Sequence, residues 1–90
     1  MAFDPTDAYR LHPQVALRPE PFGALAYHYG NRKLVFLKTA KIVDVVRTLG
    51  DYDSVDDALA GAGVPLGRRP TYVQALADLE RSEIICAATR

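Results

Sequence analysis

Four aspartates are the densest group of side chains in the chain that could bind a metal. Asp51, Asp53, Asp56 and Asp57 alternate with other residues in the manner of a calcium-binding loop. Such a loop, begun at Asp51, needs glycine at its sixth position and glutamate at its twelfth, where this chain has Asp56 and Ala62. Because acidic side chains also favour the first turn of a helix, we interpret these aspartates as helix-capping residues.

The other candidate ligands or nucleophiles are His12, His28 and Cys86. They are widely separated and lack the i, i+4 pairing of a metal site, so we expect no metal ligands among them. The chain contains no Gly-x-Ser-x-Gly signature and no glycine-rich phosphate loop. We expect His28 on the polar face of a strand and Cys86 as a small buried side chain. The sequence therefore predicts a protein that has no catalytic residues and no cofactor, and is not an enzyme.

The composition favours one small domain. Its 90 residues, 49% of them apolar, suffice for one core but leave little room for an enclosed cofactor chamber. The 11 basic and 11 acidic side chains cancel, which argues against overall electrostatic binding to nucleic acid or to an anionic membrane. No apolar run approaches the roughly 20 residues of a membrane-spanning helix. Residues 1–5 lack the pattern of a signal peptide, so we expect a cytoplasmic protein.

The first residues predict little regular structure. Residues 1–12 are mostly polar and show neither a helical nor an alternating apolar period, so we expect a flexible N-terminal arm, followed by one domain over residues 13–90. Gln14–Arg18 predicts a short strand, which Pro19 and Pro21 end. Because proline cannot donate to a ladder, this strand belongs at a sheet edge.

Two further runs predict a hairpin. Ala24–Tyr29 and Lys33–Lys38 are rich in aliphatic and aromatic residues and are joined through Gly30 and Asn31, which suit a tight turn. The period of two puts three large side chains on one face of the first strand: Leu25, Tyr27 and Tyr29. The second strand is apolar on both faces, with Leu34 and Phe36 on one and Val35 and Leu37 on the other.

From Thr39 onwards the apolar period is that of helices. Thr39 is the expected N-cap of a first helix that Gly50 ends. A second helix is predicted over Ser54–Ala62, because Ser54 and Asp57 have the spacing of a capping box. A third is predicted over Pro70–Leu79, with proline in its first turn. Strands followed by helices predict an α+β domain.

A family resemblance covers residues 9–49. The stretch from Tyr9 to Gly30 (YRLHPQVALRPEPFGALAYHYG), followed by Lys33–Lys38 (KLVFLK), resembles the mycofactocin biosynthesis chaperones. These belong to the PqqD-like peptide-recognition elements. The two later helices agree with the family in spacing and length.

The resemblance implies a three-stranded antiparallel sheet packed on three helices, arranged as a winged helix-turn-helix. Members of this family are not enzymes. They bind the leader of a ribosomally made precursor peptide, from which the redox cofactor mycofactocin is made, and deliver it to a radical S-adenosylmethionine (SAM), iron–sulfur maturase. The leader lies as an added strand beside the third strand, and the third helix forms the other wall. The peptide-binding residues implied here are Leu34, Val35, Phe36, Leu37, Lys38, Tyr72, Val73, Leu76 and Leu79.

The charges around the third strand agree with a peptide site. An edge strand offers unpaired N–H and C=O groups that an extended peptide can complete. Arg32, Lys33 and Lys41 form an electrostatic rim, to which Lys38 adds, so an acidic peptide with apolar residues at intervals would suit the strand. Without the resemblance, the simpler interpretation is that both faces of the strand are core and that the lysines protect its edge. The resemblance favours peptide binding.

Two other classes of function stay open. The second and third helices could form a DNA-reading helix-turn-helix, although three acidic residues offset the three arginines between Arg68 and Glu83. Alternatively, the apolar edge Leu34–Leu37 could pair with a second copy of the chain, which would make the protein a self-associating homodimer.

Overall fold

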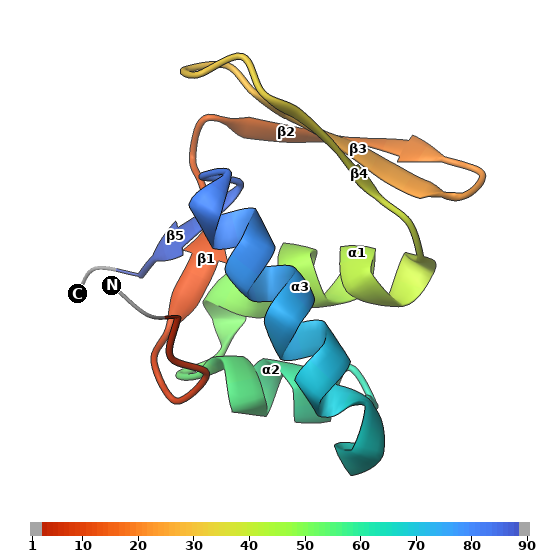
Figure 1. The fold of residues 1–90 in the computed structure, drawn as a ribbon, viewed down its shortest axis with the longest axis vertical. Coiled ribbons are helices and arrows are strands. Elements are labelled where there is room, and N and C mark those ends of the chain that lie inside the picture. The colour runs from red at the N-terminus through yellow and green to blue at the C-terminus, as the bar shows by residue number, and fades with distance from the viewer. Residues whose placement is uncertain (1–2, 89–90) are drawn as a thin grey trace.

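The computed structural model, which describes residues 3–88, has a three-stranded antiparallel sheet on one side and helices on the other (Figure 1). Strands β2 (Val15–Glu20), β3 (Gly23–His28) and β4 (Leu34–Leu37) follow one another in the order β2-β3-β4. The predicted hairpin is confirmed, with its first strand one residue earlier than expected and its second strand shorter at both ends. The central strand is β3, so β2 and β4 are the two edges of the sheet.

Three helices lie on one side of this sheet: α1 (Ala40–Thr48), α2 (Val55–Gly61) and α3 (Arg69–Arg81). Of these, α2 packs on α1, on the side away from the sheet (Figure 1). Short 3-10 turns, η1 (Leu49–Asp51) and η2 (Leu66–Arg68), follow α1 and precede α3. The α+β class expected from the sequence is confirmed.

Local signals explain where these helices begin. The Thr39 side chain accepts a hydrogen bond from the backbone N–H of Ile42 at 3.2 Å, and the Ser54 hydroxyl accepts one from Asp57 at 3.0 Å. Each bond satisfies a first-turn N–H that has no partner inside its helix. Pro70 stands in the first turn of α3, where no N–H donor is needed. These caps are the ones that the sequence predicted.

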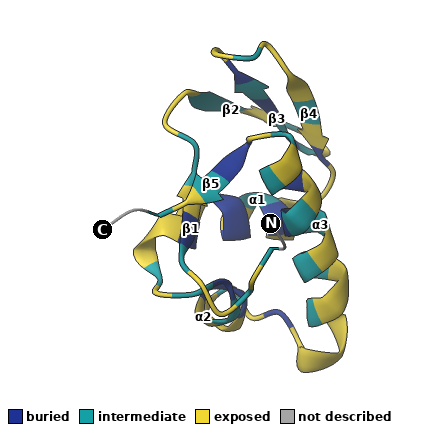
Figure 2. Ribbon diagram, turned by 60° about the vertical axis from the view of Figure 1, so that its left-hand side comes forward, coloured by how far each residue is buried: buried dark blue, intermediate teal, exposed yellow. Residues whose placement is uncertain are grey.

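A second, two-stranded sheet corrects the prediction of a flexible arm over residues 1–12. Strand β1 (Tyr9–Leu11) pairs antiparallel with β5 (Ile85–Ala87), and Figure 2 shows buried segments in both. Tyr9 is only 5% exposed, and its ring stacks on that of Phe3 with centroids 4.5 Å apart. Residues 1–2 of the predicted arm and 89–90 of the predicted domain lie outside the described residues.

The residues before β1 are held against the start of α2. The carbonyl oxygens of Pro5 and Asp7 accept hydrogen bonds from the backbone N–H groups of Asp56 at 3.0 Å and Val55 at 3.1 Å. First-turn N–H groups of a helix need partners from outside it, and this segment supplies two of them. This segment is held in place by backbone hydrogen bonds to residues far away in the sequence. Because every residue type has the backbone carbonyl that accepts them, these bonds require no periodic pattern of side chains.

The inward face of β3 is made of small residues and one histidine. Ala24, Ala26 and His28 are buried, whereas Leu25 and Tyr27 are on the opposite face. The expectation that His28 lies on a polar, solvated face is therefore wrong. Its Nδ1 accepts hydrogen bonds from the backbone N–H groups of Gly30 at 2.9 Å and Asn31 at 3.1 Å. The ring therefore stabilises the turn that follows β3.

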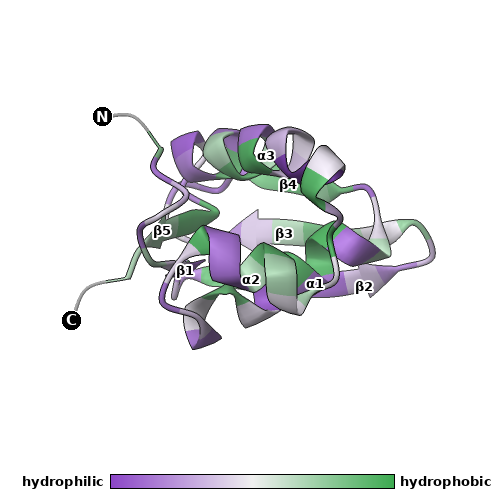
Figure 3. Ribbon diagram, turned by 90° about the horizontal axis from the view of Figure 1, so that it is seen from below, coloured by the Kyte–Doolittle hydropathy of each residue, from purple (hydrophilic) through white to green (hydrophobic). Residues whose placement is uncertain are grey.

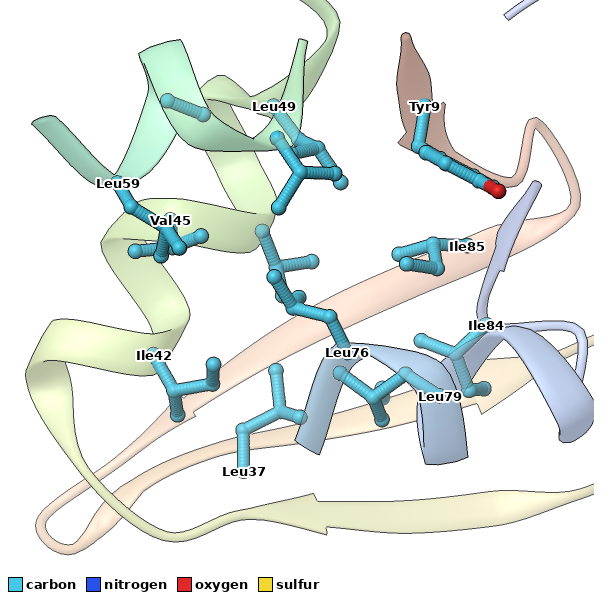
Figure 4. Packing of buried hydrophobic residues seen from close by; sticks show 14 of the residues in the cluster. Tyr9, Leu37, Ile42, Val45, Leu49, Leu59, Leu76, Leu79, Ile84 and Ile85 are labelled. Carbon is cyan, nitrogen blue, oxygen red and sulfur yellow. The ribbon is translucent and has the colours of Figure 1, made fainter. Parts of the chain in front are cut away.

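The core lies between the sheet and the helices. Leu76, fully buried on α3, is at its centre in Figure 4, where side chains from every helix converge. Cys86, expected to be buried, is half-buried on β5. The principal aliphatic core residues are Leu37, Ile42, Val45, Val46, Leu49, Val55, Leu59, Leu76, Leu79, Ile84 and Ile85.

Gly23 fixes the position of β3 against β4. Its φ of +151° is a conformation that side chains rarely adopt, and a Cβ at this residue would overlap the carbonyl oxygen of Leu37. We expect Gly23→Ala to lower the free energy of unfolding by about 2 kcal/mol or more, because both backbone strain and the clash must be relieved. Urea unfolding followed by circular dichroism measures this change.

Gly67→Ala is the matched control. A Cβ at Gly67 would have no neighbour within 4 Å, so its effect should stay within about 0.5 kcal/mol. Equal stabilities of the two variants would show that the contact between Gly23 and Leu37 does not fix the strand.

A candidate binding cleft between β4 and α3

A cleft of about 450 Å³ lies between the outer edge of β4 and α3. In Figure 3 the two elements lie side by side, with apolar residues on both. Its walls carry Val35, Phe36, Leu37, Lys38, Thr39, Ile42, Arg68, Thr71, Tyr72, Ala75, Asp78 and Leu79. The lining is thus mainly apolar, with charged side chains among it.

The backbone of β4 offers hydrogen-bonding groups beside this cleft. The N–H of His28 donates to the carbonyl of Lys33 at 3.0 Å. These two residues, which are opposite each other, therefore form a hydrogen-bonded pair of the antiparallel ladder. Hydrogen-bonded pairs alternate along an antiparallel ladder, so Val35 also bonds to β3. The N–H and C=O groups of Leu34 and Phe36 therefore point to the open edge.

The turn between β3 and β4 is tied to the end of α3. The Asn31 side-chain amide donates to the carbonyl of Ser82 at 3.4 Å and to the carboxylate of Glu83 at 3.3 Å. Its Oδ1 accepts the N–H of Lys33 at 2.9 Å, which holds the turn itself. This link joins the two walls of the cleft at one end.

Six of the nine residues implied as peptide-binding line this cleft: Val35, Phe36, Leu37, Lys38, Tyr72 and Leu79. The other three do not. Leu34 is 56% exposed, with its side chain on the outer face of the sheet. Leu76 is fully buried, and Val73 is half-buried against the core, because both lie on the side of α3 that packs inward.

None of the three residues predicted to form the electrostatic rim lines the cleft. The Lys41 ammonium donates to the carbonyl of Ala62 at 2.8 Å and so caps the end of α2 instead. Arg32 and Lys33 lie in the turn between β3 and β4 and do not line the cleft. Lys38 does line it.

Six lining residues were missed by the sequence reasoning: Thr39, Ile42, Arg68, Thr71, Ala75 and Asp78. The last four, with Tyr72 and Leu79, follow one face of α3 at steps of three and four residues. Extending this helical spacing from Tyr72 and Leu79 would have found them. Thr39 and Ile42 give no such signal, because their place depends on how α1 packs.

The charged side chains of the cleft are two cations and one carboxylate, and the carboxylate already has partners within α3. Lys38 and Arg68 line it as cations, and Arg68 precedes the N-terminus of α3, which is itself electropositive. Asp78, the acidic lining residue, accepts hydrogen bonds from Arg81 and from Gln74, so its charge is partly neutralised. The cleft therefore favours an anionic group beside Lys38 and Arg68.

No group of three or more metal-ligating side chains occurs among residues 3–88. The longest helix, α3, has 13 residues, and none in the described part of the chain has the length and apolarity to cross a membrane. The cleft offers an open strand edge, an apolar lining and two cationic side chains, Lys38 and Arg68.

Comparisons with known proteins place the chain among peptide chaperones. The sequence pattern of the Peptide chaperone MftB family matches residues 8–86. The chain is 53% identical over 83 residues to Peptide chaperone MftB of Mycobacterium tuberculosis, covering 92% of this chain and 76% of that protein. It is 48% identical over 85 residues to its namesake of Mycolicibacterium smegmatis, covering 94% and 83%. No solved structure matches the chain. The chain belongs to the MftB peptide chaperone family.

Proposed function

We propose that this protein is a peptide chaperone of mycofactocin biosynthesis that binds the leader of a precursor peptide in the cleft between β4 and α3. The leader adds to the sheet as a fourth strand beside β4, and the complex is delivered to a radical SAM maturase. The observation that carries this proposal is the open edge of β4 beside an apolar cleft.

The opposite edge of the sheet is less suited to strand addition. The N–H of Tyr29 donates to the carbonyl of Gln14 at 2.8 Å, so alternation turns the backbone groups of Val15, Leu17 and Pro19 to the free side of β2. Pro19 has no N–H to donate there. A strand added at β2 would therefore lack one hydrogen bond from the sheet, whereas every residue of β4 has an N–H.

The side chains of the cleft select among extended peptides. Successive residues of a strand point to opposite sides, so every second leader residue would enter the cleft. Leu79 and Ala75 offer it an apolar surface, and Lys38 and Arg68 favour a carboxylate. We infer a leader with alternating apolar residues and an acidic residue near these two cations.

The chaperone acts by proximity. A tethered leader holds the reactive end of the precursor near the active site of the maturase, which raises its effective concentration without new chemistry. No residue of the cleft has to take part in bond breaking.

Replacing Phe36 by proline tests strand addition directly. Phe36→Pro removes an N–H that points to the open edge, whereas proline at Val35 or Leu37 would break the ladder with β3. We expect Phe36→Pro to bind the precursor leader at least tenfold more weakly than Phe36→Ala, which loses the ring but keeps the N–H. Calorimetric titration measures both affinities, with a scrambled leader as the specificity control. Equal affinities of the two variants would contradict strand pairing at β4.

A carboxylate placed on the cleft side of α3 tests the other wall. Ala75 lines the cleft, whereas Gln74 is exposed on the adjacent side of the same helix. We expect Ala75→Glu to weaken leader binding at least tenfold, because it adds bulk and a negative charge to the site, and Gln74→Glu to change it less than twofold. Fluorescence anisotropy with a labelled leader makes the comparison. Similar losses in both variants would argue for a general charge effect.

The open edge of β4 also supports a second role, the pairing of two copies of the chain. The two roles compete for the same backbone groups. We expect any dimer seen by light scattering to dissociate when the leader is added. A dimer that persists at saturating leader would have to form through another surface.

A further inference from the structure

The face of the sheet that points away from the helices carries most of the exposed apolar bulk of the described chain. Four of its five large, exposed hydrophobic residues belong to β4 or to the turns that flank β3: Phe22 at 48%, Tyr29 at 63%, Leu34 at 56% and Phe36 at 58%. Figure 2 shows the exposed residues along β4. We call this surface the outer sheet face.

The side chains of this face form one continuous patch. Leu34 is opposite Tyr27 in the ladder, and Phe36 is opposite Leu25. The ring of Phe22 meets that of Phe36 edge to face at 5.9 Å, and a shallow depression lies between these rings and Lys38. At the other end of the patch, the rings of Tyr27 and Tyr29 meet at 5.1 Å.

The proposed peptide site does not account for this patch. The peptide strand would bond to the edge of β4 and project half its side chains into the cleft, so Phe22 and Tyr29, which lie away from that edge and outside the cleft, would not be covered. Contiguous exposed apolar surface of this kind is typical of protein interaction sites. The patch therefore needs an occupant of its own.

The surrounding charges indicate the chemistry of that occupant. Residues 14–38 contain four basic side chains and one acidic side chain, a net charge of +3 within a chain whose total is zero. The acidic one, Glu20, pairs with Arg18 at 3.2 Å. Two of these cations border the outer sheet face: Arg18, opposite Leu25 in the ladder, and Lys38, beside the rings of Phe22 and Phe36. The face is thus an apolar centre with cations at its edge, which is complementary to an apolar surface with carboxylates at its rim.

A second copy of the chain does not fit this description. Two outer sheet faces related by a twofold axis would bring the cations at the edge of one copy, Arg18 and Lys38, close to the cations at the edge of the other, and like charges oppose such contacts. Single-stranded nucleic acid is also disfavoured, because the aromatic rings pack edge to face on one another and present less free ring surface for bases to stack on.

We propose that the outer sheet face, centred on Tyr29, Leu34 and Phe36, is the docking surface for an acid-rimmed apolar patch on the enzyme that receives the peptide. This inference rests on the proposed function. Because the bound leader would extend the same sheet beyond β4, its outward side chains would adjoin Phe36. The enzyme would then contact the chaperone and the leader on one continuous surface.

Substitutions at exposed residues test this surface without disturbing the core. The probe is the purified radical SAM enzyme encoded in the same genome, immobilised for biolayer interferometry. We expect Phe22→Ser and Tyr29→Ser, at the two ends of the patch and outside the cleft, each to weaken binding to this enzyme at least tenfold. The affinity for the leader, measured by calorimetry, should change less than twofold. Leu66→Ser is the matched control, because Leu66 is 76% exposed and lies on η2, away from the sheet.

The possible results are distinct. Enzyme binding that is lost in the Phe22 and Tyr29 variants but kept in Leu66→Ser supports the outer sheet face. Unchanged binding in both sheet variants, or a wild-type chain that does not bind the enzyme, overturns this inference. Failure of the wild-type chain to bind the leader would instead refute the proposed function. Binding of a single-stranded RNA oligonucleotide that depends on Phe22 and Tyr29, without enzyme binding, would identify a nucleic-acid surface and also overturn the inference.

Discussion

The register between β3 and β4 is the constraint on which the rest of the structure depends. It is held at one end by Gly23, whose bare Cα allows close approach to the Leu37 carbonyl, and at the other by the hydrogen bond from His28 to Lys33. A shift of one residue would exchange the two faces of β4. Leu37 would then leave the core and Phe36 would enter it. The cleft, the open backbone edge and the apolar outer face all follow from this one alignment.

Short-range signals made much of this fold predictable. The hairpin around Asn31 and the caps at Thr39 and Ser54 depend on residues close together in the chain, and each is where the sequence indicated. Strands β1 and β5 have three residues each and pair across most of the chain, so no local period revealed them. His28 was misplaced for a similar reason. Its polarity suggested solvent, whereas its buried ring accepts hydrogen bonds from N–H groups of the turn that follows β3.

The cleft was predictable in outline because a resemblance named its two walls. The individual residues that line the cleft were harder to predict, because tertiary packing decides which side of α3 faces the core. Leu76 and Leu79 are both apolar and lie three residues apart, yet the first is wholly within the core and the second also reaches the cleft. Lys41 shows the same limit for charge: it is near β4 in sequence, but it caps the end of α2. Sequence spacing gives the element, and packing decides which neighbour a side chain meets.

The pairing of β1 with β5 has a consequence for engineering. The N–H of Ala88 donates to the carbonyl of Ala8 at 3.0 Å, so the two ends of the described fold lie next to each other. Neither strand contributes a residue to the cleft. Neighbouring ends of this kind allow circular permutation and insertion into a loop of another protein. The domain could therefore be inserted as a cassette into a host enzyme, leaving β4 free to recruit peptides to a new active site.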